Sequence, residues 1–319
     1  MGHREGPPGH PPLGPGGEAA LIHVVGHTAI DHILRVPRFP DRNGSTFVSG
    51  HQVFFGGGAA NTAAGIARLG APVTLVSAVG EEFAGSNYER WLSGLGVALD
   101  LVVAPGKRTP RAFVFTDDGG DQVTYFEWGA SETFAAREAP SLDQVHLATA
   151  DPGFNVRVAE RGRLVSFDPG QDIIWYTADQ IRRILARVRI LFANRHEMIH
   201  LSRILGVPRE DILGQVPVVV VTLDAEGSLL YTGGREHRIP VVPADVVDPT
   251  GAGDAYRAGF LAAYHRGYSP LTSCRVGATT ASFAIEKAGC QTNLPDWNRM
   301  TARYWTHFGD LPSAGERGT

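Results

Sequence analysis

The chain has 319 residues, 43% of them hydrophobic, with a net charge of −4 and two cysteines. This length allows one large α/β domain or two smaller ones. Because the chain has no block of like charges, a nucleic-acid groove or a membrane surface is not indicated. Two cysteines cannot build a disulfide framework. No stretch matches a secretory signal or a membrane span, so we expect a cytoplasmic protein.

Both ends of the sequence are predicted to be flexible. Residues 1–18 are rich in Gly and Pro and bury too little apolar surface to offset the entropy of ordering, and residues 309–319 are similar. We assign residues 19–308 to one α/β domain, in which short apolar runs alternate with helical stretches. Strands are predicted at 21–25, 73–79, 145–148, 164–168, 190–193, 216–222 and 238–247, and helices at 59–69, 86–95, 179–188 and 254–266.

The apolar runs predict the fold class. Short continuous runs of this kind are typical of strands buried on both faces, as in a parallel sheet covered by helices. Residues 46–55 and 111–128 instead alternate polar and apolar side chains, like exposed antiparallel strands. We therefore predict a doubly wound, mostly parallel sheet flanked by helices, with a small β-sheet lid that includes these two segments.

The segment 248–254 (Asp-Pro-Thr-Gly-Ala-Gly-Asp) is the most informative one. Gly251, Ala252 and Gly253 allow a tight turn that points N–H groups at an anion where a helix begins. Asp254 would repel a resting phosphate there. Its carboxylate fits better as a base that takes a proton from an attacking hydroxyl. The alternative is structural, with Thr250 or Asp254 capping the helix.

Two upstream segments carry groups that suit a sugar. The cluster Gly-Gly-Gly-Ala-Ala-Asn61 includes Gly57 and Gly58, which let a ligand approach the backbone, and Asn61, which offers one acceptor and two donors. Asp31, at the end of a strand–turn segment, can bind two adjacent hydroxyls. For both segments an ordinary turn is the alternative interpretation.

Asn194 and Glu197 follow a predicted strand, where ligands bind in doubly wound folds. Glu197 can hold Mg²⁺ through water. The same residues spell His196-Glu-Met-Ile-His200, which matches the zinc-protease pattern but needs a third ligand. The extended form of that pattern fails, because Arg203 stands where it has a glycine. A P-loop and a dinucleotide-binding glycine motif are both missing from the sequence.

Together these segments resemble the ribokinase-like (PfkB) carbohydrate kinase family. The cluster ending at Asn61 resembles its first signature and residues 248–260 its second, with Asn194 and Glu197 between them. The segments that are similar to the archaeal-type nucleoside kinase branch are 26–31, 109–113, 128–130, 151–155, 168–172 and 289–295.

The resemblance implies a kinase that transfers a phosphoryl group from ATP to the 5′-hydroxyl of a nucleoside, either adenosine or a broader set of purine nucleosides. Asp254 would be the general base, beside an anion hole formed by Gly251, Ala252 and Gly253. The residues implied to bind the nucleoside are Asp31, Gly57, Gly58, Asn61 and Asp151. The residues implied to bind the nucleotide and Mg²⁺ are Asn194, Glu197, Thr222, Gly227 and Asn293. Asp248 and Thr250 are implied contributors to a site for K⁺.

A sugar or sugar-phosphate kinase of the same family is the alternative. A phosphorylated sugar would need cations near the lid, where Arg111 is the obvious candidate, whereas Phe113, Phe126 and Trp128 suit a nucleobase. Two features depart from the family pattern: Asp224 stands where relatives commonly have glycine, and a proline separates Asp248 from Thr250. Exposed lid edges often pair, so we expect a homodimer through the lid.

Overall fold

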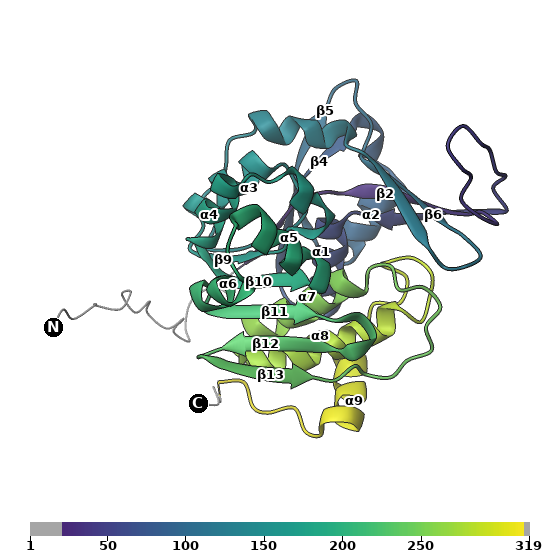
Figure 1. Cartoon of the computed structure of the whole chain (residues 1–319). Coiled ribbons are helices and arrows are strands. Elements are labelled where there is room, and N and C mark those ends of the chain that lie inside the picture. The colour runs from purple at the N-terminus through teal and green to yellow at the C-terminus, as the bar shows by residue number, and fades with distance from the viewer. Residues whose placement is uncertain (1–20, 316–319) are drawn as a thin grey trace.

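The computed structural model describes residues 21–315, which form a nine-stranded sheet between two layers of helices and a second sheet of four strands (Figure 1). The predicted tail 1–18 lies outside the described residues. Of the predicted tail 309–319, residues 309–315 contain no helix or strand, and the last four lie outside the described residues. Within residues 21–315, no helix combines the length and the apolar character needed to cross a bilayer.

The large sheet confirms the predicted fold class. In spatial order its strands are β13 (Arg235–Ile239), β12 (Ser228–Thr232), β11 (Val218–Thr222), β10 (Val188–Asn194), β9 (Leu164–Phe167), β8 (Gln144–Leu147), β1 (Ile22–Val25), β4 (Val73–Gly80) and β5 (Ala98–Ala104). Neighbours from β11 to β5 are parallel, and β12 and β13 are antiparallel. The parallel strands therefore present their carboxyl ends along one edge.

Helices cover both faces of this sheet, so the sheet separates two hydrophobic cores. One core contains α1 (Gly58–Arg68), α2 (Asn87–Gly94), α7 (Ala252–His265), α8 (Pro270–Ala284) and α9 (Trp297–Phe308). The other contains α3 (Pro152–Arg161), α4 (Ala178–Leu185), α5 (Arg195–Leu205) and α6 (Arg209–Gln215). Adjacent strand residues alternate between them: Val24 packs in the first core and Val25 in the second.

The smaller sheet, which we call the lid, has the strand order β3 (Gly50–Gly56), β2 (Ala29–Arg35), β6 (Arg111–Thr116) and β7 (Gln122–Glu127). It projects to one side of the large sheet (Figure 1). Strand β2 was not among the strands predicted from the sequence. Asp31 was expected at the end of a strand–turn segment, but it lies inside β2, paired with Phe54 of β3 and Ala112 of β6.

One predicted strand is largely wrong. Residues 238–247 read as a β-like run, but β13 ends at Ile239, and residues 240–251 form neither helix nor strand. Pro240 and Pro243 explain this difference, because a proline has no N–H to donate to a neighbouring strand. This irregular segment leads directly into Gly251 at the start of α7.

Candidate active site

A cavity of about 650 Å³ lies between the inner face of the lid and the carboxyl ends of the parallel strands. This is the edge at which ligands bind in doubly wound folds. The wall from the lid includes Asp31, Ala112, Val114 and Phe126, and the wall from the strand ends includes Thr149, Asp168, Asn194 and Thr222.

The N-terminus of α7 forms the floor of the cavity. Gly251 caps the helix in the left-handed region at φ 81°, and a Cβ there would lie 2.7 Å from Cβ of Cys290. Gly251 therefore requires glycine, whereas a Cβ on Gly253 would lie 2.5 Å from Nη1 of Arg257 and would displace that guanidinium. The Ala252 N–H donates to the Pro249 carbonyl at 3.2 Å, which occupies one of the three donors predicted for the anion hole.

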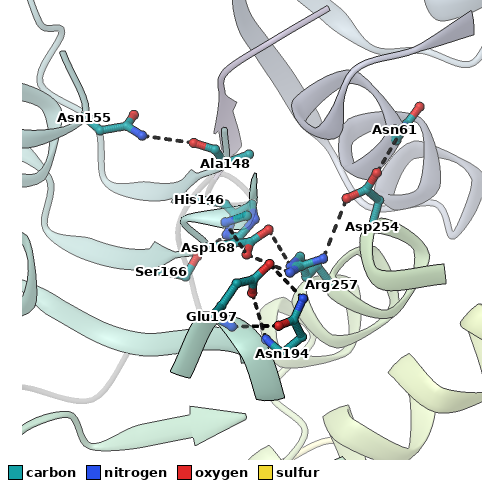
Figure 2. Close-up of polar contacts among 11 residues, drawn as sticks. Asn61, His146, Ala148, Asn155, Ser166, Asp168, Asn194, Glu197, Asp254 and Arg257 are labelled. Carbon is teal, nitrogen blue, oxygen red and sulfur yellow. Dashed lines mark hydrogen bonds and ion pairs between the residues drawn. The ribbon is translucent and has the colours of Figure 1, made fainter. Parts of the chain in front are cut away.

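Asp254 lies in the first turn of α7 with its side chain 21% exposed. Asn61 Nδ2 donates to its Oδ2 at 2.9 Å, and Arg257 Nη1 lies 3.7 Å from its Oδ1 (Figure 2). Burial raises the pKa of Asp254, while Arg257 and the Asn61 hydrogen bond act in the opposite direction. The carboxylate is therefore held from two sides in a partly desolvated position.

Asn61 is itself held in place. Its Oδ1 accepts from Gln291 Nε2 at 2.8 Å, and the same Nε2 lies 2.8 Å from the hydroxyl of Tyr88. The Tyr88 hydroxyl donates to the Gly56 carbonyl at 2.7 Å, which extends the network to the end of lid strand β3. Gln291 falls in the family-like segment 289–295 without a role predicted for it, and no sequence pattern pointed to Tyr88.

Asp31 is only 7% exposed and faces the cavity. Burial, followed by the charge of Asp254, raises the pKa of Asp31 to about 7, although Cys290 donates to its Oδ2 at 3.9 Å. A Cβ on Gly56 would overlap the Asp31 carboxylate, and Gly57 has φ 91° with no room for a side chain. Gly57 and Gly58 both line the cavity.

Asn194 and Glu197 form a capping box at the start of α5. Glu197 Oε2 accepts from the Asn194 backbone N–H at 2.7 Å, and Oε1 accepts from Nδ2 at 3.0 Å (Figure 2). Both residues line the cavity, as do Thr222, Gly227 and Thr250. Their roles toward nucleotide and metal stay predictions.

Three predicted site residues do not line the cavity. Asp151 caps α3 by accepting from the Phe154 N–H at 2.7 Å, and Asn293 donates to the Phe283 carbonyl at 2.7 Å. Asp248 accepts from the N–H groups of Thr250, at 2.9 Å, and Gly289, at 3.2 Å. It thus ties the segment before α7 to the loop after α8.

The zinc-protease interpretation has no support in the structure. Glu197 points into the cavity wall and caps its own helix, whereas neither His196 nor His200 lines the cavity. Among the described residues, no three His, Cys, Asp or Glu side chains are grouped so that they can hold a metal. The third ligand that this interpretation requires is therefore missing from residues 21–315.

Asp168 and Arg257 are further polar residues of the cavity wall that the sequence analysis did not place there. Arg257 Nη2 donates to Asp168 Oδ1 at 2.6 Å, and Nε lies 2.6 Å from Oδ2. Burial raises the pKa of Asp168 to about 7, against the influence of Arg257. Asp168 was quoted only as part of a family-like segment, and no local spacing connects it to a residue of α7.

Comparisons with known proteins identify the family. Residues 19–297 match the profile of the pfkB family carbohydrate kinases. The chain belongs to this family. It is 42% identical to the nucleoside kinase of Methanocaldococcus jannaschii, and the match covers 92% of this chain and 99% of that protein. It is 41% identical to the nucleoside kinase of Methanothermobacter thermautotrophicus, and that match covers 91% of this chain and 97% of that protein.

Solved structures agree with this family. The crystal structure of the M. jannaschii nucleoside kinase, an archaeal member of the ribokinase family, covers 92% of this chain and 100% of its own, with a TM-score of 0.86. The structure of the Burkholderia thailandensis nucleoside kinase in complex with inosine is 26% identical in sequence and has a TM-score of 0.85. That match covers 92% of this chain and 99% of its own. The predicted family and fold are thus confirmed, and the chain is a phosphotransferase with an alcohol group as acceptor.

Proposed function

We propose that this kinase transfers the γ-phosphoryl group of ATP to the 5′-hydroxyl of a purine nucleoside. The observation that carries the proposal is that Asp254 shares one cavity with the N-terminus of α7 and with the inner face of the lid. A base, a set of anion-binding donors and a surface for an organic acceptor are the parts that this reaction needs. The nucleoside kinases to which the chain is similar support the choice of acceptor.

The inner face of the lid suits a nucleobase better than a second phosphate. Phe126, Ala112 and Val114 line the cavity and offer an aromatic ring and apolar surface. Arg111, the candidate for a sugar-phosphate contact, does not line it and pairs with Glu127 at 2.7 Å. Because no Lys or Arg of the four described lid strands lines the cavity, the lid favours a nucleoside over a phosphorylated sugar.

Only part of the predicted base pocket lies at the cavity. Phe113 and Trp128 do not line it. The Phe113 ring stacks on His32 with centroids 4.9 Å apart, and Trp128 contacts the ring of His27 edge-on at 5.1 Å. Phe126 lies 4.8 Å from the same His27 ring, which also lines the cavity. We therefore assign the base to the surface formed by Phe126 and His27.

In the proposed reaction the 5′-hydroxyl oxygen attacks the γ-phosphorus while Asp254 takes the hydroxyl proton. The new O–P bond forms as the bond between the γ-phosphorus and the bridging oxygen to the β-phosphate breaks, and ADP leaves with that electron pair. Donors at the start of α7 face the charge that gathers on the transferring group. Asp31 and Asn61 are placed to hold the ribose hydroxyls.

The charges of the cavity fit a divalent cation. Its lining includes the carboxylates of Asp31, Asp168, Glu197, Asp224 and Asp254, which would repel a nucleotide triphosphate. We propose that Asn194 and Glu197 hold Mg²⁺ through water, and that Asp248 and Thr250 contribute to a K⁺ site. When bound, Mg²⁺ neutralises the charge of the phosphate oxygens.

The test is an ATP-consumption assay with panels of nucleosides, sugars and sugar phosphates, with and without K⁺. We expect purine nucleosides to be phosphorylated at the 5′-oxygen.

In Asp254→Asn we expect kcat to fall by about 100-fold or more, because no group remains to take the proton, while ATP binding is retained. Asp143→Asn, an exposed acid outside the cavity, is the control. Near wild-type turnover by Asp254→Asn would exclude Asp254 as the base, and turnover of sugars alone would exclude a nucleoside kinase.

A further inference from the structure

Arg257 is the only Lys or Arg among the cavity-lining residues in the described part of the chain, and five acidic residues line the same cavity. It lies one helical turn after Asp254 on α7, and its side chain is 11% exposed. A guanidinium in such a place is charged at any physiological pH. It is therefore the fixed positive charge of the site.

The three guanidinium nitrogens of Arg257 contact different carboxylates. Nη2 donates a hydrogen bond to Asp168 Oδ1 at 2.6 Å, and Nε lies 2.6 Å from Oδ2 as an ion pair without hydrogen-bond geometry. Nη1 points toward Asp254, 3.7 Å from its Oδ1 (Figure 2). It also lies next to the position that a Cβ on Gly253 would occupy. Asp168 thus fixes the plane of the guanidinium and aims its free end at Asp254.

A buried ion pair is weak evidence for stability, since desolvation offsets most of its attraction. The pair between Arg257 and Asp168 therefore needs another explanation. A nearby imidazole, His146, adds no charge: burial, and then Arg257, lower its pKa to about 3. Arg257 itself stays charged because Asp168, Glu197 and Asp254 together outweigh the opposing effect of burial.

The ionised carboxylate of Asp254 requires a nearby cation, because most of the polar groups around it are acidic. Asp31 on β2, Glu197 on α5 and Asp168 after β9 line the same cavity and are acidic, and Cys290 after α8 is a buried thiol. Asn61 on α1 supplies one neutral hydrogen bond. Without Arg257, burial and the surrounding carboxylates would favour a protonated Asp254, which cannot act as a base.

We propose that Arg257, fixed by Asp168, is a positioning residue that keeps Asp254 ionised and aimed at the acceptor hydroxyl. The proposal rests on the proposed function, because it assigns Arg257 a task only if Asp254 is the base. It differs from a purely structural role in one measurable way: its loss is overcome by raising the pH, which ionises Asp254 without help.

The test is kcat as a function of pH, at saturating nucleoside and ATP, for Arg257→Met/Asp168→Asn. The double substitution avoids leaving Asp168 as an unpaired buried charge. We expect the midpoint of the acid limb to rise by about one pH unit or more, with kcat near the alkaline plateau recovering to within roughly tenfold of wild type. Arg257→Lys, which keeps the charge, should retain the wild-type midpoint.

Further variants test whether the shift of the acid limb comes from the loss of Arg257 beside Asp254. Arg183→Met replaces an exposed arginine on α4 and should leave the profile unchanged. Asp31 also titrates near neutral pH, so the comparison is repeated in an Asp31→Asn background, where the shift should persist. If the double variant does not fold by circular dichroism, Arg257→Gln, which can keep one hydrogen bond to Asp168, should show the same shift.

Two outcomes would overturn the proposal: an equal loss of kcat at every pH, or a shift that disappears in the Asp31→Asn background. Asp254→Asn distinguishes failure of this inference from failure of the proposed function. If Asp254→Asn is inactive while the acid limb of the double variant is unmoved, the role of Arg257 is wrong and that of Asp254 stands. If Asp254→Asn is active, the proposed base is wrong as well.

Discussion

Asp31 shows how a single site residue lowers stability. Its pKa rises from 3.8 to about 7 on folding, mainly through burial, so between these values the folded chain keeps a proton that the unfolded chain has lost. The contribution of this site to the free energy of unfolding therefore decreases as the pH rises from about 4 to 7, and is constant above that range. Ionised Asp31 is thus a source of instability at neutral pH.

Asp31→Asn removes this effect. We expect the variant to be more stable than wild type by on the order of 2 kcal/mol at pH 8, with a smaller gain at pH 5, where wild-type Asp31 is mostly protonated. Urea unfolding at the two pH values measures the difference. Asp143→Asn, in which the side chain is 71% exposed, should show no such dependence. An equal gain at both pH values would contradict the burial argument.

Asp224 is one of the two predicted departures from the family pattern, the other being the proline between Asp248 and Thr250. It has φ 51°, a left-handed conformation that favours glycine, and its carboxylate lines the cavity. We expect Asp224→Gly to lower the KM for ATP by about threefold or more, because one repulsive charge is removed, and to leave the fold intact. Steady-state kinetics at several Mg²⁺ concentrations check this. Asp224→Asn should give a similar decrease, and an increased KM in both variants would show that the carboxylate helps to bind the nucleotide.

At the scale of elements, the close approach of α1 and α7 brings Asn61 to Asp254. Gly65 makes this approach possible, because a Cβ there would lie 2.5 Å from Cβ of Ala258 on α7. We expect Gly65→Ala to cost about 1–3 kcal/mol of stability and to lower kcat, since the two helices must separate and weaken the Asn61–Asp254 hydrogen bond.

The double variant Gly65→Ala/Ala258→Gly removes the Cβ of residue 258 that the new Cβ of residue 65 would meet. It should therefore recover much of the kcat that Gly65→Ala loses. Gly214→Ala on α6 is the control, because a Cβ at that position meets nothing within 4 Å. Thermal unfolding and kcat are measured on all three proteins. If Gly65→Ala loses no activity, the spacing of α1 and α7 does not position the base.

At the scale of the whole molecule, the lid has an uncovered face. Phe126 and Thr124 of β7 line the cavity, so the alternating residues Val123 and Tyr125 face away from it, 39% and 64% exposed. Val53 of β3 is 54% exposed. We expect two chains to pair through this face, as the homodimer predicted from the sequence requires.

Light scattering of the purified protein tests the pairing. Wild type should have the mass of two chains, and Val53→Asp/Tyr125→Asp should have the mass of one, because a carboxylate disfavours burial in an apolar interface. Trp305→Asp on α9, which changes an equally exposed apolar residue away from the lid, should keep the wild-type mass. A monomeric wild type would contradict the prediction.

The sequence by itself determined the parts of this protein that depend on near neighbours. Buried apolar runs such as 216–222 predicted the parallel sheet, because a strand covered on both faces has no polar side to alternate. Gly251 and Gly253 predicted the turn into α7 with Asp254 in its first turn, since few residues other than glycine allow that backbone. These features require only local chain geometry.

Only the tertiary structure decided which distant groups meet. Arg257 and Asp168 are 89 residues apart in the sequence, and Asn61 and Gln291 are 230 apart. Strand β2, with Asp31 inside it, became visible only through its pairing with β3 and β6. Such contacts depend on the order of strands in a sheet and the spacing of packed helices, which no local pattern records. The proposed base was therefore visible in the sequence, whereas the groups that hold its carboxylate became visible only in the fold.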